Sequence, residues 1–343
     1  MFAKKNLVAA AALLAIAGAA QADVKVYGTL DVGMGSVEDA HAKDDKTRTT
    51  QVTSGGMMTS YLGFAGSEDL GSGLKAEFAL ETFMAPDTGA TLTNMAGGFW
   101  GRGSWVGLSG NFGRVALGQY DNPLFTSGYT YNPFGSSMLV SPTMRHFYSK
   151  TASLGFDTGW VNSVTYESPV VQGFNAVLQF APKEKATGSS DSYTVAGGYN
   201  NGPISAMLTY EKAGLVDGSK AYLADQKVLN LGASYDLGVA KLFGQYTNLK
   251  TSKVAAGDVD VKNVIYQVGV SVPLNDKLSV MASFGSNKAT DNDTDESGTD
   301  RVFSVGADYL LSKRTDVYVA FVNNTQTGLT SGQTIAAGIK HNF

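Results

Sequence analysis

Apolar and polar residues alternate with a period of two along much of this chain. Over residues 24–32 the large aliphatic side chains fall on one face and the polar side chains on the other, and residues 75–81 and 316–321 repeat the arrangement. Successive side chains of a β-strand point to opposite faces, so each segment predicts a strand with one apolar and one polar face. Such a strand suits a wall that separates lipid from water.

The final segment of the chain carries the same pattern up to its last residue. Ile335, Ile339 and Phe343 fall on one face, while Thr334 and Lys340 fall on the other. A strand that ends the chain in this way suits a barrel wall. The edge strand of a soluble β-sandwich shows the same alternation, so the pattern of connections has to separate the two.

Short and long connections alternate along the sequence. The short ones are at residues 67–73, 110–113, 168–173, 200–203, 236–238, 273–276 and 311–315. The long ones are at about residues 35–57, 85–101, 121–161, 182–191, 212–227, 250–260, 287–300 and 324–331. These connections delimit sixteen strands. An up-and-down membrane barrel has short turns at one end and long loops at the other, so the alternation favours a barrel over a sandwich.

The N-terminal segment has the three parts of a secretory signal peptide. Lys4 and Lys5 form a basic region, residues 7–17 are rich in Ala and Leu, and Ala22 ends a small-x-small cleavage motif. We therefore expect residues 1–22 to be removed between Ala22 and Asp23. The remaining residues, 23–343, form a single exported domain.

Composition narrows the functional classes further. The chain has no cysteine, which excludes disulfides and Cys-ligated metals, and its net charge of −4 gives no electrostatic footprint for nucleic acid. After the signal segment, no run approaches the roughly 20 apolar residues of a transmembrane helix. A β-barrel and a soluble β-protein remain.

No motif in the sequence indicates catalysis or a bound cofactor. Glu77 and Glu81 are about 13 Å apart along one strand, beyond the ~5–9.5 Å that separates the carboxylates of glycosidases. Asp291, Asp293 and Asp295 have the spacing of a calcium loop, but Glu296 occupies the position where that loop turns on a glycine. We interpret residues 291–300 as a solvated acidic loop and keep a divalent-cation site as the alternative. We expect no enzyme activity and no cofactor.

Six segments of the chain, taken together, carry a family resemblance. They are Tyr27–Asp31, Gly66–Ala76, Gly107–Gly113, Asn162–Tyr166, Gly306–Thr315 and Gly338–Phe343. In this order and spacing the chain resembles the general diffusion porins of Gram-negative bacteria, in the β-proteobacterial branch. The resemblance implies an all-β fold, a 16-stranded antiparallel transmembrane β-barrel with long extracellular loops, which assembles as a homotrimer. It also implies that a third loop folds into the lumen and that Phe343 is an assembly signal.

The longest predicted connection, at residues 121–161, is the expected third loop. Its many aromatic residues argue against disorder, and they pack on the barrel wall if the loop folds inward. The turn Asn132-Pro133-Phe134-Gly135 resembles the Pro-Glu-Phe-Gly motif of the family's loop, shifted and without its glutamate. Asp121 and Arg145 are among its charged residues.

The wall opposite the loop departs from the family pattern. Family members often carry basic residues there, and the corresponding positions here are Tyr61, Ala65 and Gln119, with Val161 where an arginine often precedes the Asn-Ser pair. We expect Arg145 to replace part of this charge. The residues predicted to form the pore constriction are Tyr61, Lys75, Glu77, Glu81, Gln119, Asp121 and Arg145. With few basic residues, the constriction predicts a weakly cation-selective or nearly neutral pore.

The resulting hypothesis is an outer-membrane porin for passive diffusion of small hydrophilic solutes and ions. Its expected partners are two identical subunits, the outer membrane with its lipopolysaccharide, and the export and barrel-assembly machinery. One alternative is a substrate-selective channel in which the aromatic residues of the third loop guide sugars or aromatic compounds. Two others are a barrel that works as an adhesin or enzyme through its outer loops, and a soluble exported β-protein.

Overall fold

The structure is a computed structural model that describes residues 23–43, 45, 48–92, 97–148, 158–183, 190–214, 224–253 and 260–343. The signal segment expected at residues 1–22 lies outside these ranges. The strands are β1 (Asp23–Val37), β2 (Thr49–Ser54), β3 (Tyr61–Gly71), β4 (Leu74–Ala85), β5 (Ala90–Leu92), β6 (Gly103–Gly110), β7 (Gly113–Asp121), β8 (Gly159–Glu167), β9 (Phe174–Ala181), β10 (Ser192–Asn201), β11 (Ile204–Ala213), β12 (Ala224–Asp236), β13 (Lys241–Lys253), β14 (Val261–Pro273), β15 (Leu278–Asp291), β16 (Ser297–Leu310), β17 (Thr315–Gln326) and β18 (Gly332–Asn342). The helices are α2 (Pro123–Thr130) and α3 (Pro142–Tyr148).

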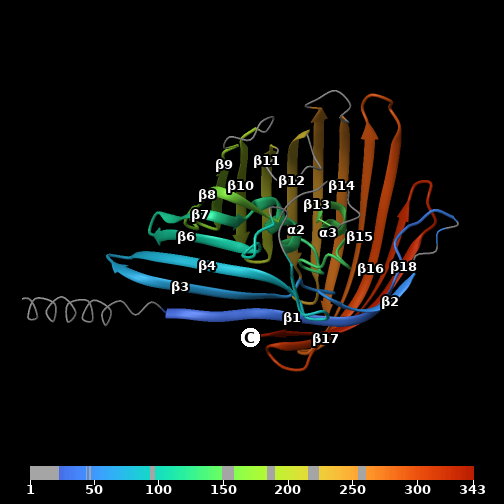
Figure 1. Cartoon of the computed structure of the whole chain (residues 1–343), viewed down its shortest axis with the longest axis horizontal. Coiled ribbons are helices and arrows are strands. Elements are labelled where there is room, and N and C mark those ends of the chain that lie inside the picture. Colours follow the sequence, from blue (N-terminus) through green and yellow to red (C-terminus); the bar gives the residue numbers. More distant parts are fainter. Residues whose placement is uncertain are drawn as a thin grey trace, which may run out of the picture.

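The strands form one antiparallel sheet that closes on itself through β1 and β18. Along this seam Thr29 lies opposite Asn342 and Ser36 lies opposite Ile335. The barrel has 16 strands, as predicted, because β5 only forms a hairpin with the end of β4 and because β2 and β3 are two parts of one strand. In Figure 1, β3, β4 and β6 run across the view whereas β13–β16 run up it, as expected for tilted strands in different parts of a barrel wall.

Side chains alternate between the two faces of the wall as the sequence predicts. Val26 is 58% exposed and Leu117 is 52% exposed on the outer face, whereas Thr29 and Asp31 are buried on the inner face. Many other large apolar side chains are exposed on the barrel strands, and so extensive an apolar surface needs an apolar surrounding, which a lipid bilayer supplies. The outer face is therefore the lipid-facing side, and the inner face lines a polar lumen.

The tight turns lie where the sequence places them, although one long loop is shorter than predicted. Between β3 and β4, the backbone of Gly71, Ser72 and Gly73 has positive φ angles of 86°, 53° and 79°, which favours glycine. The expected loop at residues 287–300 is instead a hairpin, because β15 continues to Asp291 and β16 begins at Ser297. Residues 287–291 and 297–300 thus extend two neighbouring strands past their predicted ends.

The second barrel strand is interrupted by an inward excursion at residues 55–60. Both β2 and β3 pair with β1, so the chain leaves the sheet after Ser54 and returns at Tyr61. The Asp31 carboxylate accepts hydrogen bonds of 2.7 Å from the backbone N–H groups of Met57 and Met58. The hydroxyl of Tyr318 donates to the same carboxylate, at 2.6 Å. The buried carboxylate therefore holds the excursion inside the barrel.

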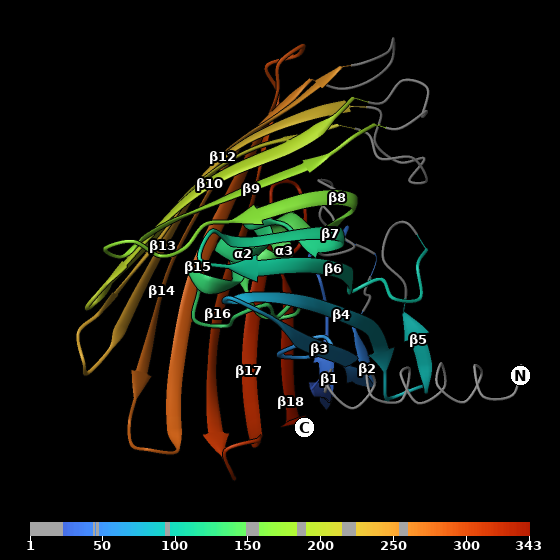
Figure 2. The same cartoon turned by 90° about the vertical axis from the view of Figure 1, so that its left-hand side faces the viewer.

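The long connection between β7 and β8 folds into the lumen, in agreement with the prediction. Its helix α2 contacts β10, β11 and β12, and α3 contacts β14, β15 and β16. Figures 1 and 2 both show the two helices inside the barrel, between these strands and the wall formed by β6 and β7. In the described part of the chain, neither helix is long and apolar enough to cross a membrane. We call this connection loop 3.

Candidate functional site

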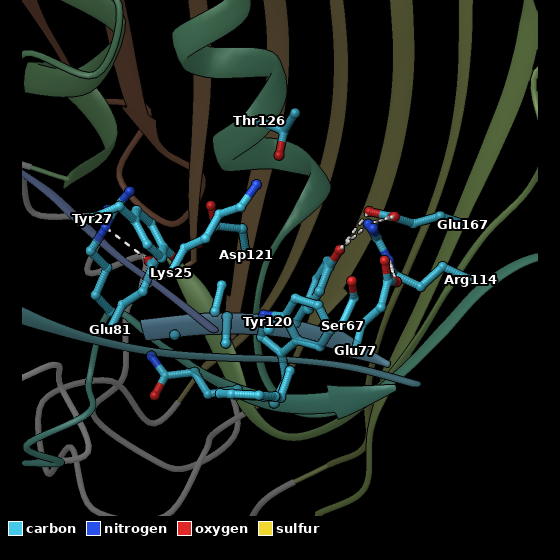
Figure 3. Close-up of a pocket in the computed structure, with 18 of the residues that line it drawn as sticks. Lys25, Tyr27, Ser67, Glu77, Glu81, Arg114, Tyr120, Asp121, Thr126 and Glu167 are labelled. Carbon is cyan, nitrogen blue, oxygen red and sulfur yellow. Dashed lines mark hydrogen bonds and ion pairs between the residues drawn. The ribbon is translucent and has the colours of Figure 1, made fainter. Parts of the chain in front are cut away.

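A cavity of about 540 Å³ lies inside the barrel between loop 3 and the wall formed by β1, β3, β4, β6 and β7. Figure 3 shows Tyr27, Lys25 and Glu81 at one side of it and Glu77, Arg114 and Glu167 at the other, with Thr126 of α2 above them. Its charged lining residues are Asp23, Lys25, Glu77, Glu81, Arg102, Arg114, Asp121 and Glu167. Acidic and basic side chains therefore both line the space that is left between loop 3 and the wall.

Helix α2 forms the loop side of the cavity. Asn122 is its N-cap, because the Asn122 side-chain oxygen accepts a hydrogen bond of 2.9 Å from the Phe125 N–H, and Pro123 occupies the first helical position. Thr126 and Tyr129 line the cavity, one helical turn apart. Burial raises the pKa of Tyr129, as does the Asp121 carboxylate, so its phenol stays uncharged. The helix therefore offers hydroxyl groups rather than charge to the lumen.

One group of charges on the opposite wall is centred on Glu81. The Arg102 Nε lies 3.0 Å from a Glu81 carboxylate oxygen, and the hydroxyl of Tyr27 donates a hydrogen bond to the same carboxylate. The Arg102 guanidinium also lies over the ring of Tyr61, 4.1 Å from its centroid. This cation–π contact and the ion pair fix the orientation of the guanidinium.

The second group is centred on Arg114, nearer the tight turn between β3 and β4. Arg114 bridges two carboxylates, with Nε 2.9 Å from Glu77 and Nη1 2.9 Å from Glu167. The Tyr120 hydroxyl donates to the other oxygen of Glu167, at 2.9 Å. Because Glu77 and Glu81 are four residues apart on β4, the two groups lie at different depths along the lumen, separated by about 13 Å.

A β-bulge in β7 directs two consecutive side chains toward the cavity. The pairing of β7 with β8 shifts between Gly118 and Tyr120. Gln119 and Tyr120 consequently both line the cavity, whereas neighbours in a regular strand would face opposite sides. The Gln119 side chain donates to the backbone oxygen of Gly101, which holds the segment that carries Arg102 against the wall.

Polar side chains from successive strands fasten the first half of loop 3 to the wall. The Asn122 side-chain amide donates to Glu211 of β11 at 2.8 Å, and the Ser127 hydroxyl donates to Asn230 of β12 at 2.6 Å. All four residues are buried. Unpaired polar groups would be costly at these depths, so the bonds specify where α2 lies.

The second half of loop 3 is fastened in the same way. Gln267 of β14 accepts a hydrogen bond of 2.9 Å from the Thr143 N–H, and its side chain also contacts the Thr143 hydroxyl. Ser304 of β16 donates to the backbone oxygen of Val140 at 2.6 Å. We call Glu211, Asn230, Gln267 and Ser304 the clasp residues. Together they hold the loop along most of the wall opposite the cavity.

The aromatic residues of loop 3 pack mainly against the wall. Tyr131, Phe134 and Phe147 are each between 2% and 3% exposed. Their contact partners are apolar inward side chains such as Val228 and Met281. These buried rings help to fix the position of the loop.

The structure places four of the predicted constriction residues on the cavity. Glu77, Glu81, Gln119 and Asp121 all line it. Tyr61 lies beside them, beneath the Arg102 guanidinium. Their position fits the predicted role in the pore constriction. That role stays a prediction.

The other two predicted residues lie elsewhere. Lys75 is exposed near the end of β4, two residues before Glu77. Arg145 is buried in α3, pairs with the Asp39 carboxylate and donates to the backbone oxygen of Leu139 at 3.1 Å. Neither residue is among those that line the cavity. Arg145 thus contributes to loop attachment in the described structure.

The sequence analysis missed the basic residues of the cavity. Lys25, Arg102 and Arg114 line it, and none of the three was among the predicted residues. Strand alternation could have identified Lys25, which shares a face with Tyr27, because the pattern in β1 is regular. Arg102 precedes β6 in an irregular segment, and its position depends on tertiary contacts with Glu81 and Tyr61.

The chain is similar over almost its whole length to bacterial outer-membrane proteins. The sequence profile of a family described as Gram-negative porin matches residues 9–329. Outer membrane porin protein 32 of Delftia acidovorans is 34% identical, over 98% of this chain and 95% of its own length. The major outer membrane protein P.IB of Neisseria gonorrhoeae is 28% identical, over 92% of each chain.

A solved structure shares the fold and bears on charge selectivity. The anion-selective porin from Comamonas acidovorans superposes with a TM-score of 0.76 at 27% identity, over 94% of this chain and 100% of that one. Anion selectivity is a property of that protein. The similarity nevertheless gives no support to the cation preference expected from the sequence.

Proposed function

This chain belongs to the Gram-negative porin family, and we propose that small hydrophilic solutes and ions diffuse passively through its lumen. It is an outer-membrane channel, and its relatives are channel proteins rather than enzymes. The observation that carries the proposal is the polar cavity between loop 3 and the wall formed by β1, β3, β4, β6 and β7, which we call the β1–β7 wall. A lumen lined by charges and hydroxyl groups keeps water and hydrated solutes in the path.

We propose that this channel discriminates only weakly between anions and cations. Both signs of charge face the cavity, and the bases are largely compensated by partners. Arg102 is paired with Glu81, and Arg114 is shared by Glu77 and Glu167. Rings of one uncompensated sign give strong selectivity, whereas alternating, paired charges give little.

Planar-bilayer recording of the folded protein under a KCl gradient tests both statements. The proposal predicts ohmic single-channel steps and a reversal potential near zero. Absence of steps from a demonstrably folded protein contradicts the diffusion function. A large reversal potential of either sign leaves the channel intact and contradicts weak selectivity.

We also propose that the protein assembles as a homotrimer and that Phe343 is read during barrel assembly. The trimer and the assembly signal follow from the family resemblance, and lipopolysaccharide is the expected lipid neighbour of the outer leaflet. Chemical cross-linking of the detergent-extracted protein is expected to give a trimer as its largest product. Deletion of Phe343 is expected to reduce the folded protein in the outer membrane, whereas its synthesis stays unchanged.

A further inference from the structure

A second, smaller cavity adjoins the first and shares one residue with it. Its volume is about 180 Å³, and Arg102 lines both cavities. The other lining residues are Met58, Thr59, Phe83, Leu92, Phe125, Ser136, Met138 and Thr158. Most of them are apolar, which is unusual for the interior of a water-filled channel. We call this cavity the Arg102 pocket.

Three separate parts of the fold build the apolar side of the Arg102 pocket. Met58 comes from the inward excursion at residues 55–60, Phe83 from β4 and Met138 from loop 3. The excursion and the loop are joined, because the Ser137 hydroxyl donates to the backbone oxygen of Gly56 at 2.6 Å. Methionine side chains adapt to apolar groups of different shapes, so the pocket can bind ligands whose apolar parts differ in shape.

The guanidinium of Arg102 has one edge left for a ligand. Its Nε faces Glu81 at 3.0 Å, and its plane lies against the Tyr61 ring. Among the described residues, none makes a hydrogen bond or ion pair with its Nη1 or Nη2. Terminal guanidinium nitrogens present parallel donors that match the two oxygens of a carboxylate. The side chain is held in place, so little entropy is lost when a carboxylate binds.

We propose that the Arg102 pocket is a binding site for small carboxylates that carry an apolar body, such as an aromatic ring or a branched alkyl group. The carboxylate binds the free edge of Arg102, and the apolar body lies among Met58, Phe83 and Met138. A carboxylate without an apolar body gains only the first contact, and an apolar alcohol gains only the second. The site deepens the proposed diffusion function and rests on it, because the solute reaches the pocket from the lumen.

Single-channel recording with benzoate and acetate tests this site with two probes of equal charge. In channels that show normal KCl steps, benzoate is expected to reduce the current with saturable concentration dependence, and acetate at the same concentrations is not. Equal effects of benzoate and acetate overturn the proposal. Loss of the KCl steps themselves contradicts the proposed function instead, so the two failures are distinguishable.

Three variants locate the effect. Arg102→Gln is expected to weaken the apparent affinity for benzoate by about tenfold or more, the usual value of a charge-assisted hydrogen bond. Arg114→Gln removes the same charge from the main cavity but lies outside the pocket, so its effect is expected to be smaller. Met138→Ser is expected to weaken benzoate block and leave the acetate response unchanged. Equal losses in the two arginine variants, or no loss in Met138→Ser, overturn the assignment.

Discussion

At the scale of single residues, several of the charged side chains that line the cavity form ion pairs with one another. Arg114 lies between two carboxylates. Its Nε is 2.9 Å from a Glu77 oxygen, and its Nη1 is 2.9 Å from a Glu167 oxygen. All three side chains are partly exposed to the cavity, so water screens the pairs and their value for stability is small. Their main effect is on the electrostatic potential that a passing ion meets.

Replacing Arg114 therefore changes selectivity more than stability. Arg114→Gln leaves Glu77 and Glu167 without their shared cation, and the reversal potential in a KCl gradient is expected to move in the direction of cation preference. Arg48→Gln is the control, since Arg48 is exposed and pairs with Glu38 at a distance from the cavity. An unchanged reversal potential in Arg114→Gln would show that this site lies off the ion path.

Glu211 gives a second prediction at the residue scale. It is fully buried, and its hydrogen-bond partners Asn122 and Thr194 are both uncharged. A buried carboxylate without a cation is costly, so Glu211→Gln keeps an acceptor for Asn122 and removes the cost. We expect the urea midpoint of Glu211→Gln to equal or exceed that of the unsubstituted protein. Glu211→Ala is expected to lose about 1–3 kcal/mol, because the Asn122 amide is left unpaired. Equal destabilisation by the two substitutions would contradict this account.

At the scale of elements, loop 3 is the part of the described chain that folds into the barrel lumen. Its two short helices have little stability of their own, because helices of this length are marginal in water. The clasp residues and the buried aromatic rings supply the missing stability. The position of the loop is thus determined by the wall it lies on, and loss of a clasp residue is expected to increase its motion.

Gln267→Ala tests the clasp. It removes the acceptor for the Thr143 N–H, and the expected result is a larger current noise in the open channel with little change in mean KCl conductance. Gln333→Ala on β18 is the matched control, because Gln333 is exposed beside the buried Thr334 and so faces away from the lumen. If the open-channel current noise of both variants equals that of the unsubstituted channel, the clasp residues do not restrain the loop.

The elements also show what could be predicted from the sequence and what could not. Strand alternation and the spacing of the turns predicted the wall, its polar face and the approximate limits of loop 3, because these depend on local patterns. That loop 3 folds into the lumen was implied by the family resemblance. The helices α2 and α3 were missed, since the cap at Asn122 gains its buried partner Glu211 only in the folded barrel. The excursion at residues 55–60 was missed for a similar reason, because the carboxylate that holds it belongs to β1.

At the scale of the whole molecule, closure of the barrel depends on the seam between its first and last strands. The N–H of Phe343 donates to the oxygen of Gly28 at 3.1 Å, and the N–H of Gly28 donates back to Phe343 at 3.3 Å. A Cβ atom at Gly28 would lie 2.3 Å from the backbone oxygen of Tyr61 and 2.8 Å from the Phe343 ring. The seam therefore has no space for a side chain at this position.

Gly28→Ala is expected to impair closure for this reason. Gly244→Ala is the control, because no atom lies within 4 Å of a Cβ built there. On unheated SDS gels, where folded barrels keep a mobility different from that of the unfolded chain, Gly28→Ala is expected to give a reduced folded band. Folding of Gly28→Ala to the same yield as Gly244→Ala would contradict the close packing of the seam.

The central claim for the whole molecule is that solutes pass between loop 3 and the β1–β7 wall, and the absence of native cysteines allows a direct test. Thr126→Cys places one thiol on the cavity side of α2, and Leu117→Cys places one on the lipid-facing side of β7. During single-channel recording, a cationic methanethiosulfonate reagent is predicted to lower the KCl conductance of Thr126→Cys in discrete steps and to leave Leu117→Cys unchanged. If the reagent demonstrably modifies Thr126→Cys and the conductance does not change, the ion path lies elsewhere and the account is contradicted.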